Sequence, residues 1–257
     1  MPPSFIPKEL PPFNANTSIG AFEIGTLLAT TLFGATCIQV YIYFERYAKD
    51  HKLIKALVVF VWLLELGHTI AICHALYIMT VSWFTQPENL VILPVSVDAS
   101  VLLSGLIGPL EQAWFIHRLY TFSKNKVLTG VCCILSFLRI FGSVALSGVS
   151  LQRLMLLEFD QKYWWLLMSI VIVGTLNDGL LAGSLAWYLN KSKNQTVARA
   201  TNSVLNHLIM WVVETSAITS VATVSMMICF FTMPANLVYI GAYVCLAKLY
   251  ANALLAS

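Results

Sequence analysis

Seven long apolar segments limit what this chain can fold into. Each has about 20 or more residues, enough for a helix to cross the roughly 30 Å hydrocarbon core of a bilayer. The chain of 257 residues is 58% hydrophobic and 11% charged, whereas about 25% of residues are charged in soluble domains. Because lipid offers no partners to backbone groups, such segments cross as helices. The predicted spans are 20–44, 54–82, 92–118, 127–150, 163–189, 203–231 and 235–256.

We therefore predict an all-α fold, a polytopic membrane bundle of seven transmembrane helices over residues 20–257. Residues 1–19 form an extended extracellular or luminal lead-in, because prolines recur in it up to Pro12. It lacks the basic start, apolar centre and cleavage site of a signal peptide, so we expect the first helix to direct insertion. The predicted protein is integral and multi-pass, lies in the plasma membrane or endoplasmic reticulum, and has the lipid bilayer as its first partner.

Lysine and arginine residues predict the orientation, because basic connections stay on the cytosolic side. Ten lie in or beside the connections after the first, third and fifth spans, and three lie on the other side. We expect the N-terminus outside and the C-terminus in the cytosol. The net charge of +3 thus follows from topology, and no basic patch suggests nucleic acid. The ten are Arg46, Lys49, Lys52, Lys55, Arg118, Lys124, Lys126, Lys191, Lys193 and Arg199; the three are Lys8, Arg153 and Lys162.

The cysteines predict neither disulfides nor a metal site. All six fall inside predicted spans and behave there as small apolar residues. No Cys-x-x-Cys or Cys/His metal spacing occurs, so we expect no metal and no cofactor. The six are Cys37, Cys73, Cys132, Cys133, Cys229 and Cys245.

The second span carries a polar stretch from Trp62 to Tyr77. Glu65 and His68 are three residues apart, so on a helix they share one face and can share one ligand. His74 lies on the opposite side. An ionisable residue inside a membrane span indicates a functional site, because only a partner or a cavity keeps it there.

Ionisable residues near the midplane recur on four other predicted helices. Arg139 in the fourth span almost requires a carboxylate, and we expect it to pair with Asp178, Glu111 or Glu214. Lys248 is expected to neutralise a second acid. The candidate ligand-binding residues are Glu65, His68, Asp98, Arg139, Asp178, Glu214 and Lys248.

Small and hydroxyl residues predict close helix packing. Ser100, Ser104 and Gly108 are four residues apart and form a stripe on which a neighbouring helix can pack, and Gly179-x-x-x-Gly183 is a second motif of this kind. The hydroxyls between Thr215 and Thr223 either bond the local backbone or line a cavity.

Three known classes of membrane protein fit the sequence poorly. A dinuclear metal oxidase needs more than one Glu-x-x-His pair, and only Glu65-x-x-His68 occurs. Lys248 with Asp178 or Glu65 imitates the lysine and counterion of a retinal protein, but such a lysine also pairs structurally. The outline matches a G-protein-coupled receptor, yet the third span ends in His117-Arg118-Leu-Tyr120 and no external cysteine pair occurs.

An enzyme of the terpene-cyclase type is a further class. Small fungal meroterpenoid cyclases have similar size and seven spans, and use buried carboxylates to protonate an epoxide or alkene. Glu65 with His68, Asp178 or Glu214 would supply the acid. The structural alternative is that these acids only hold the bundle together.

Several motifs can be compared with a known family. They are Trp62-x-x-Glu65-x-x-His68, Asn206-His-Leu-Ile, Glu214-Thr-x-x-Ile-Thr-Ser220, Met233-Pro234-x-Asn236-Leu-x-Tyr239 and Lys248-Leu-Tyr250-x-Asn252. With them the chain resembles a large basidiomycete fungal family of seven-helix membrane proteins catalogued as a domain of unknown function. The resemblance implies the fold and a fungal membrane origin but no activity. Relatives often carry Asp in place of Glu65 and continue into a polar cytosolic tail, so we expect a trimmed form here.

We predict a receptor-like or small-molecule-binding protein with a polar midplane cavity. Its expected ligand is a small hydrophobic molecule. A membrane-embedded enzyme with Glu65, His68, Asp178 and Glu214 as catalytic residues is the alternative. The sequence predicts no oligomeric state.

Overall fold

The computed structural model is all-helical and describes residues 16–84, 93–150, 156–195, 199–233 and 236–256. Its helices are α1 (Ala21–Arg46), α2 (Lys52–Tyr77), α3 (Val95–Ser123), α4 (Lys126–Ser150), α5 (Leu156–Gln195), α6 (Arg199–Thr232) and α7 (Val238–Ala256). One π-helical turn (Asn16–Gly20) precedes α1 and another (Ile78–Ser82) extends α2. Seven helices are long and apolar enough to cross a membrane, which confirms the predicted multi-pass bundle. Most of the predicted lead-in over residues 1–19 lies outside the described residues.

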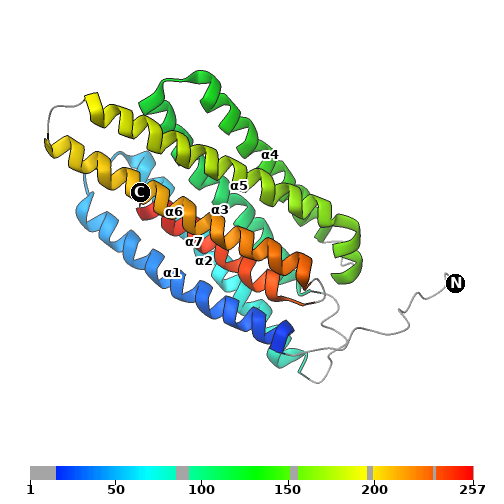
Figure 1. The fold of residues 1–257 in the computed structure, drawn as a ribbon. Helices are drawn as coiled ribbons and strands as arrows, with labels where there is room; N and C mark the ends of the chain where they lie inside the picture. Colours follow the sequence, from blue (N-terminus) through cyan, green and yellow to red (C-terminus); the bar gives the residue numbers. More distant parts are fainter. Residues whose placement is uncertain (1–15, 85–92, 151–155, 196–198, 234–235, 257) are drawn as a thin grey trace.

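Two helices, α3 and α7, form the centre of the bundle (Figure 1). They bury 56% and 61% of their most apolar segments inside the protein, whereas the other five bury between 11% and 33%. Each helix packs against the next one in the chain, and α1 packs against α7 to close the ring. In addition, α3 contacts α5 and α7. Side chains on these two helices are therefore the ones most shielded from lipid.

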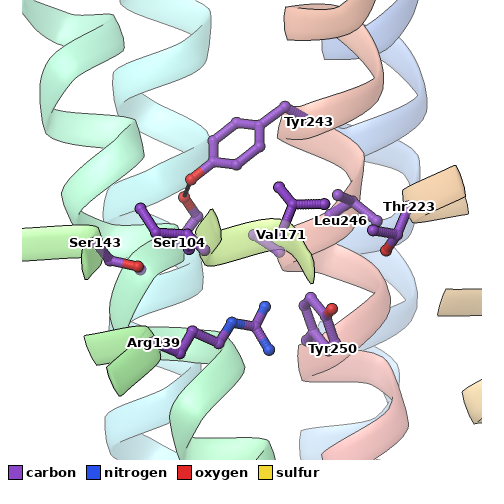
Figure 2. A pocket seen from close by; sticks show the side chains of 11 residues that line it. Ser104, Arg139, Ser143, Val171, Thr223, Tyr243, Leu246 and Tyr250 are labelled. Carbon is purple, nitrogen blue, oxygen red and sulfur yellow. Dashed lines mark hydrogen bonds between the residues drawn. The ribbon is translucent and has the colours of Figure 1, made fainter. Parts of the chain in front are cut away.

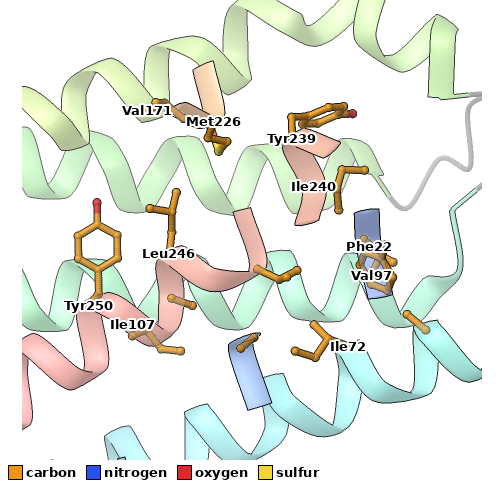
Figure 3. Packing of buried hydrophobic residues seen from close by; sticks show 14 of the residues in the cluster. Phe22, Ile72, Val97, Ile107, Val171, Met226, Tyr239, Ile240, Leu246 and Tyr250 are labelled. Atoms are coloured by element: carbon orange, nitrogen blue, oxygen red, sulfur yellow. The ribbon is translucent and has the colours of Figure 1, made fainter. Parts of the chain in front are cut away.

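Apolar side chains fill the space around α7 (Figure 3). The cluster includes Phe22, Ile72, Ile107, Met226 and Val244, from five helices, each at most 1% exposed. The outer faces of α1 to α6 carry large exposed apolar residues, as expected where the neighbour is lipid, whereas α7 has none. The interior and the outer surface of the bundle are thus both mainly apolar, so the polar residues buried in the interior stand out.

The turn between α3 and α4 shows how a short connection is built. Lys124 closes α3 in the left-handed conformation with φ 51°, and its N–H donates to the carbonyl of Tyr120 at 3.0 Å. The Asn125 side chain then caps α4 by accepting from the N–H groups of Val127 and Leu128 at 3.1 and 3.2 Å. This cap fixes the start of α4 next to the end of α3.

Glycines bring α1 and α7 into backbone contact. A Cβ atom at Gly25 would lie 2.4 Å from the carbonyl oxygen of Gly241, and one at Gly241 would lie 2.5 Å from that of Ala21. The Cys245 thiol donates to the Gly25 carbonyl at 3.3 Å. No larger residue fits at either glycine without moving a helix.

The predicted small-residue stripe of the third span packs as expected. A Cβ at Gly105 would lie 2.7 Å from Ser143, and one at Gly108 would lie 2.6 Å from Arg139, both on α4. The Ser104 hydroxyl bonds Tyr243 of α7 at 2.8 Å.

The second predicted motif, Gly179-x-x-x-Gly183, does not pack inside the chain. No described atom outside the local helix would lie within 4 Å of a Cβ at either position. The prediction that this motif packs against a neighbouring helix of the bundle is wrong, because Asp178, Leu181 and Leu185 set the inward face of α5 and both glycines lie on the opposite side.

Candidate functional site

A first charged cluster joins α7 to α2 in the middle of the bundle. Lys248 Nζ lies 2.7 Å from Glu65 Oε2. The same ammonium donates to the Glu65 carbonyl at 3.0 Å and to Thr69 Oγ1 at 2.8 Å. Lysine has three N–H donors; two of them have hydrogen-bond acceptors here, and the charge of the ammonium also faces the Glu65 carboxylate. The lysine therefore acts as a clamp on one turn of α2.

The polar atoms of Glu65 and His68, next to Lys248, have fewer hydrogen-bond partners. The Lys248, Glu65 and His68 side chains are all fully buried. Among the described residues, neither carboxylate oxygen of Glu65 and neither ring nitrogen of His68 has a hydrogen-bond partner, although Glu65 Oε2 lies within ion-pair distance of Lys248. Unpaired buried polar atoms are rare in native proteins and indicate strain, bound water or function. His68 is the buried side chain of this cluster that has no partner at all.

A second charged cluster joins α4 to α5, α3 and α7. Arg139 Nη1 lies 3.8 Å from Asp178 Oδ1, which confirms the predicted pairing of Arg139 with one of the named acids. Asp178 also accepts from Gln112 Nε2 at 2.6 Å and from the Tyr250 hydroxyl at 2.9 Å. The Arg139 guanidinium stands 4.6 Å from the centroid of the Tyr250 ring. Four helices thus contribute to one network.

Two glycines make room for the Arg139 guanidinium. A Cβ at Gly108 of α3 would lie 2.6 Å from Nη2, and a Cβ at Gly174 of α5 would lie 3.1 Å from Cζ. The planar group therefore lies between two helix backbones. Neither glycine was singled out for this role from the sequence, because small residues in membrane helices usually indicate helix contacts.

A small cavity adjoins the second cluster (Figure 2). Its volume is about 40 Å³, and Arg139 and Tyr250 lie at one side of it, while the bonded pair Ser104 and Tyr243 lies at the other. A water needs about 10–15 Å³ of such volume, so the cavity has room for a few waters and not for an organic ligand. This cavity is therefore too small for the ligand that the predicted polar midplane cavity was expected to hold.

Glu111 lies beside the second cluster. It is buried, and its Oε2 has no hydrogen-bond partner among the described residues. Its carboxyl group interacts electrostatically with Asp178 and Arg139. The cluster therefore contains two carboxyl groups and one guanidinium.

A much larger cavity, the end cavity, opens at the end of the bundle where α1 and α7 finish and α6 begins. Its volume is about 700 Å³. The side chains around it combine an apolar wall with aromatic rings and three charges. They are Gln39, Ile42, Tyr43, Arg46, Tyr47, Asp50, Ile54, Leu57, Val58, Trp114, Arg118, Trp211, Leu254, Leu255 and Ala256.

The structure separates the predicted site residues into several locations. Glu65, His68 and Lys248 form the first cluster, and Arg139 and Asp178 belong to the second. Asp98 is buried in the first turn of α3, where it accepts a hydrogen bond from Ser150. These residues do not converge on one pocket.

The prediction that Glu214 of the sixth helix faces the interior is wrong. Its side chain is exposed on the outside of the bundle. The buried stripe of α6 contains Thr219, Thr223, Met226 and Phe230, and at 3.6 residues per turn Glu214 lies about 120–180° away from these. The hydroxyls of Thr219 and Thr223 bond local carbonyls, as one of the two predictions for this segment has it. Thr223 also lines the small cavity, so for this residue both predictions are correct.

Comparison with known proteins places the similarity in the C-terminal third. The model of a family of unknown function (DUF6534) matches residues 174–257. That segment begins in α5 beside Asp178 and includes Lys248 and Tyr250. It agrees with the resemblance being strongest toward the end of the chain. No curated protein and no solved structure matches the chain.

Proposed function

We propose that this membrane protein is a receptor-like, small-molecule-binding seven-helix protein whose ligand occupies the end cavity. The observation that carries the proposal is the volume of about 700 Å³, since ligand pockets typically measure about 300–1,000 Å³. Such pockets are mostly apolar with a few polar groups that orient the ligand. The lining of the end cavity has this composition.

The lining favours an amphipathic anion. Arg46 and Arg118 contribute two positive charges, and Asp50, which accepts from the Tyr43 hydroxyl at 3.2 Å, contributes one negative charge. Among the described residues Gln39 Oε1 is buried without a hydrogen-bond partner, so it can accept from a donor group elsewhere on the ligand and not from the carboxylate. A carboxylate on an apolar body complements a wall of this kind.

The enzyme alternative lacks a comparable observation. A catalytic acid must lie within hydrogen-bond reach of its substrate. Glu65 is held by Lys248, Asp178 is held by Arg139, and Glu214 points away from the bundle. The geometry therefore supports binding better than it supports proton transfer to a substrate.

Fluorescence of the cavity tryptophans tests the proposal. Decanoate is added to the protein in nanodiscs, with decanol as the uncharged comparison. We expect saturable quenching by decanoate that decreases in a Trp114→Phe variant. Arg118→Gln should weaken decanoate by about tenfold or more, because a hydrogen bond to a charged group contributes about 1.5–3 kcal/mol.

Lys126→Gln is the matched control, because Lys126 lies at the same end of the bundle but outside the cavity lining. It should leave decanoate binding unchanged. Equal weakening by Lys126→Gln and Arg118→Gln, or quenching that never saturates, would contradict the assignment of the end cavity.

A further inference from the structure

We infer that Glu111 is a proton-binding site: it carries a proton at neutral pH, held inside the bundle beside the Arg139–Asp178 pair. The site is distinct from the end cavity and does not depend on the proposed ligand. Its ligand is the proton itself. The inference rests on the charges that meet in the second cluster and on which of their oxygens accept hydrogen bonds.

The charge balance requires a proton. Glu111 and Asp178 meet one cation, Arg139, while Lys248 is committed to Glu65. With both acids ionised the cluster would hold a net charge of −1 in the middle of the membrane. An uncompensated buried charge is costly, and a group in that position is neutralised instead. One proton brings the cluster to zero.

The hydrogen bonds indicate which acid holds it. Asp178 accepts from Gln112 and Tyr250 and faces Arg139, so both of its oxygens have donors, as an ionised carboxylate requires. Glu111 Oε2 accepts no hydrogen bond among the described residues. A buried carboxylate oxygen without a donor favours the neutral acid over the ionised one. The proton therefore belongs on Glu111.

Within the part of the chain that the structure describes, Asp178 and Arg139 are the charged groups that interact with Glu111. The helices packed against α3 are α2, α4, α5 and α7. They present Arg139 from α4, Asp178 from α5 and Tyr250 from α7. On α2, Glu65 and His68 belong to the first cluster with Lys248.

The small cavity adjoins this cluster at Arg139 and Tyr250 and has room for a few waters.

Infrared spectroscopy of the protein in nanodiscs tests the inference at neutral pH. The carbonyl stretch of a protonated carboxylic acid is resolved from the carboxylate bands and shifts in D₂O. We expect one such band in the parent. Isotopic labelling of glutamate carboxyl groups should move it, which needs no substitution.

Three variants should change the number of protonated acids from that of the parent. Glu111→Gln removes the band. Asp178→Asn also removes it, because Glu111 then ionises opposite Arg139. Arg139→Gln adds a second band, since both acids are then without a cation. Absence of the band from the parent, failure of the glutamate label to move it, or its persistence in Glu111→Gln would each overturn the assignment.

Discussion

Replacing Lys248 by methionine tests the buried clamp between α7 and α2. Methionine keeps the length and bulk of the side chain and removes its charge. In the parent, Nζ lies 2.7 Å from Glu65 Oε2 and donates to two further oxygens of α2. After the change, the Glu65 carboxylate is fully buried without a cation. Breaking a buried pair in this way costs about 3–5 kcal/mol of unfolding free energy.

The double variant separates the charge effect from packing. Lys248→Met with Glu65→Leu removes both charges, and such replacements of whole buried pairs are often neutral or stabilising by about 1–4 kcal/mol. We therefore expect the double variant to be more stable than Lys248→Met alone. Thr69 keeps its bond to the Glu65 carbonyl at 2.8 Å in either variant, so the backbone of α2 retains an internal donor.

Unfolding in sodium dodecyl sulfate, followed by circular dichroism, measures these differences. Lys126→Met serves as the control, because Lys126 is exposed at the start of α4. If Lys248→Met unfolds within about 0.5 kcal/mol of the parent, like an ordinary surface substitution, the pair does not stabilise the bundle and the argument fails.

Further predictions concern the second cluster and the topology. Gly108→Ala should destabilise the protein by about 1–3 kcal/mol, since the added Cβ would lie 2.6 Å from the Arg139 guanidinium. Gly179→Ala should be near neutral, because no described atom outside the local helix lies within 4 Å of its Cβ. Equal effects of the two substitutions in melting experiments would show that Gly108 does not make room for Arg139. Arg139→Leu should cost about 3–5 kcal/mol, and parental stability in detergent would show that the pair with Asp178 is unimportant. An epitope tag inserted after Asp50 should resist protease in sealed vesicles of cytosol-inside orientation, and cleavage there would reverse the predicted topology.

Hydropathy predicted where each helix runs, because a membrane imposes the length of an apolar segment directly. Helix rotation was harder to predict. In soluble proteins the polar face of a helix shows which side is outside, but here the outward residues, such as Ile24 and Phe141, are as apolar as the core. Glu214 and Gly179 were therefore assigned to the wrong face.

Charged partners were partly predictable. A mid-membrane arginine or lysine requires an acid, and few acids are available, so Asp178 was one of three acids predicted for Arg139, and Glu65 was one of two considered beside Lys248. The neutral members of the network, such as Gln112, give no such signal. The end cavity depends on how five helices diverge, which no local pattern in the sequence encodes.

The contact of α1 with α7 has a consequence for biogenesis. Of the seven described helices, α1 leaves the ribosome first and α7 last, so Gly25 meets Gly241 only after α7 has entered the membrane. Glu65 likewise waits for Lys248, which follows 183 residues later. Until then α2 resides in lipid with an acid that has no cation. Insertion of α7 is thus the step that both closes the ring of helices and brings a cation to Glu65.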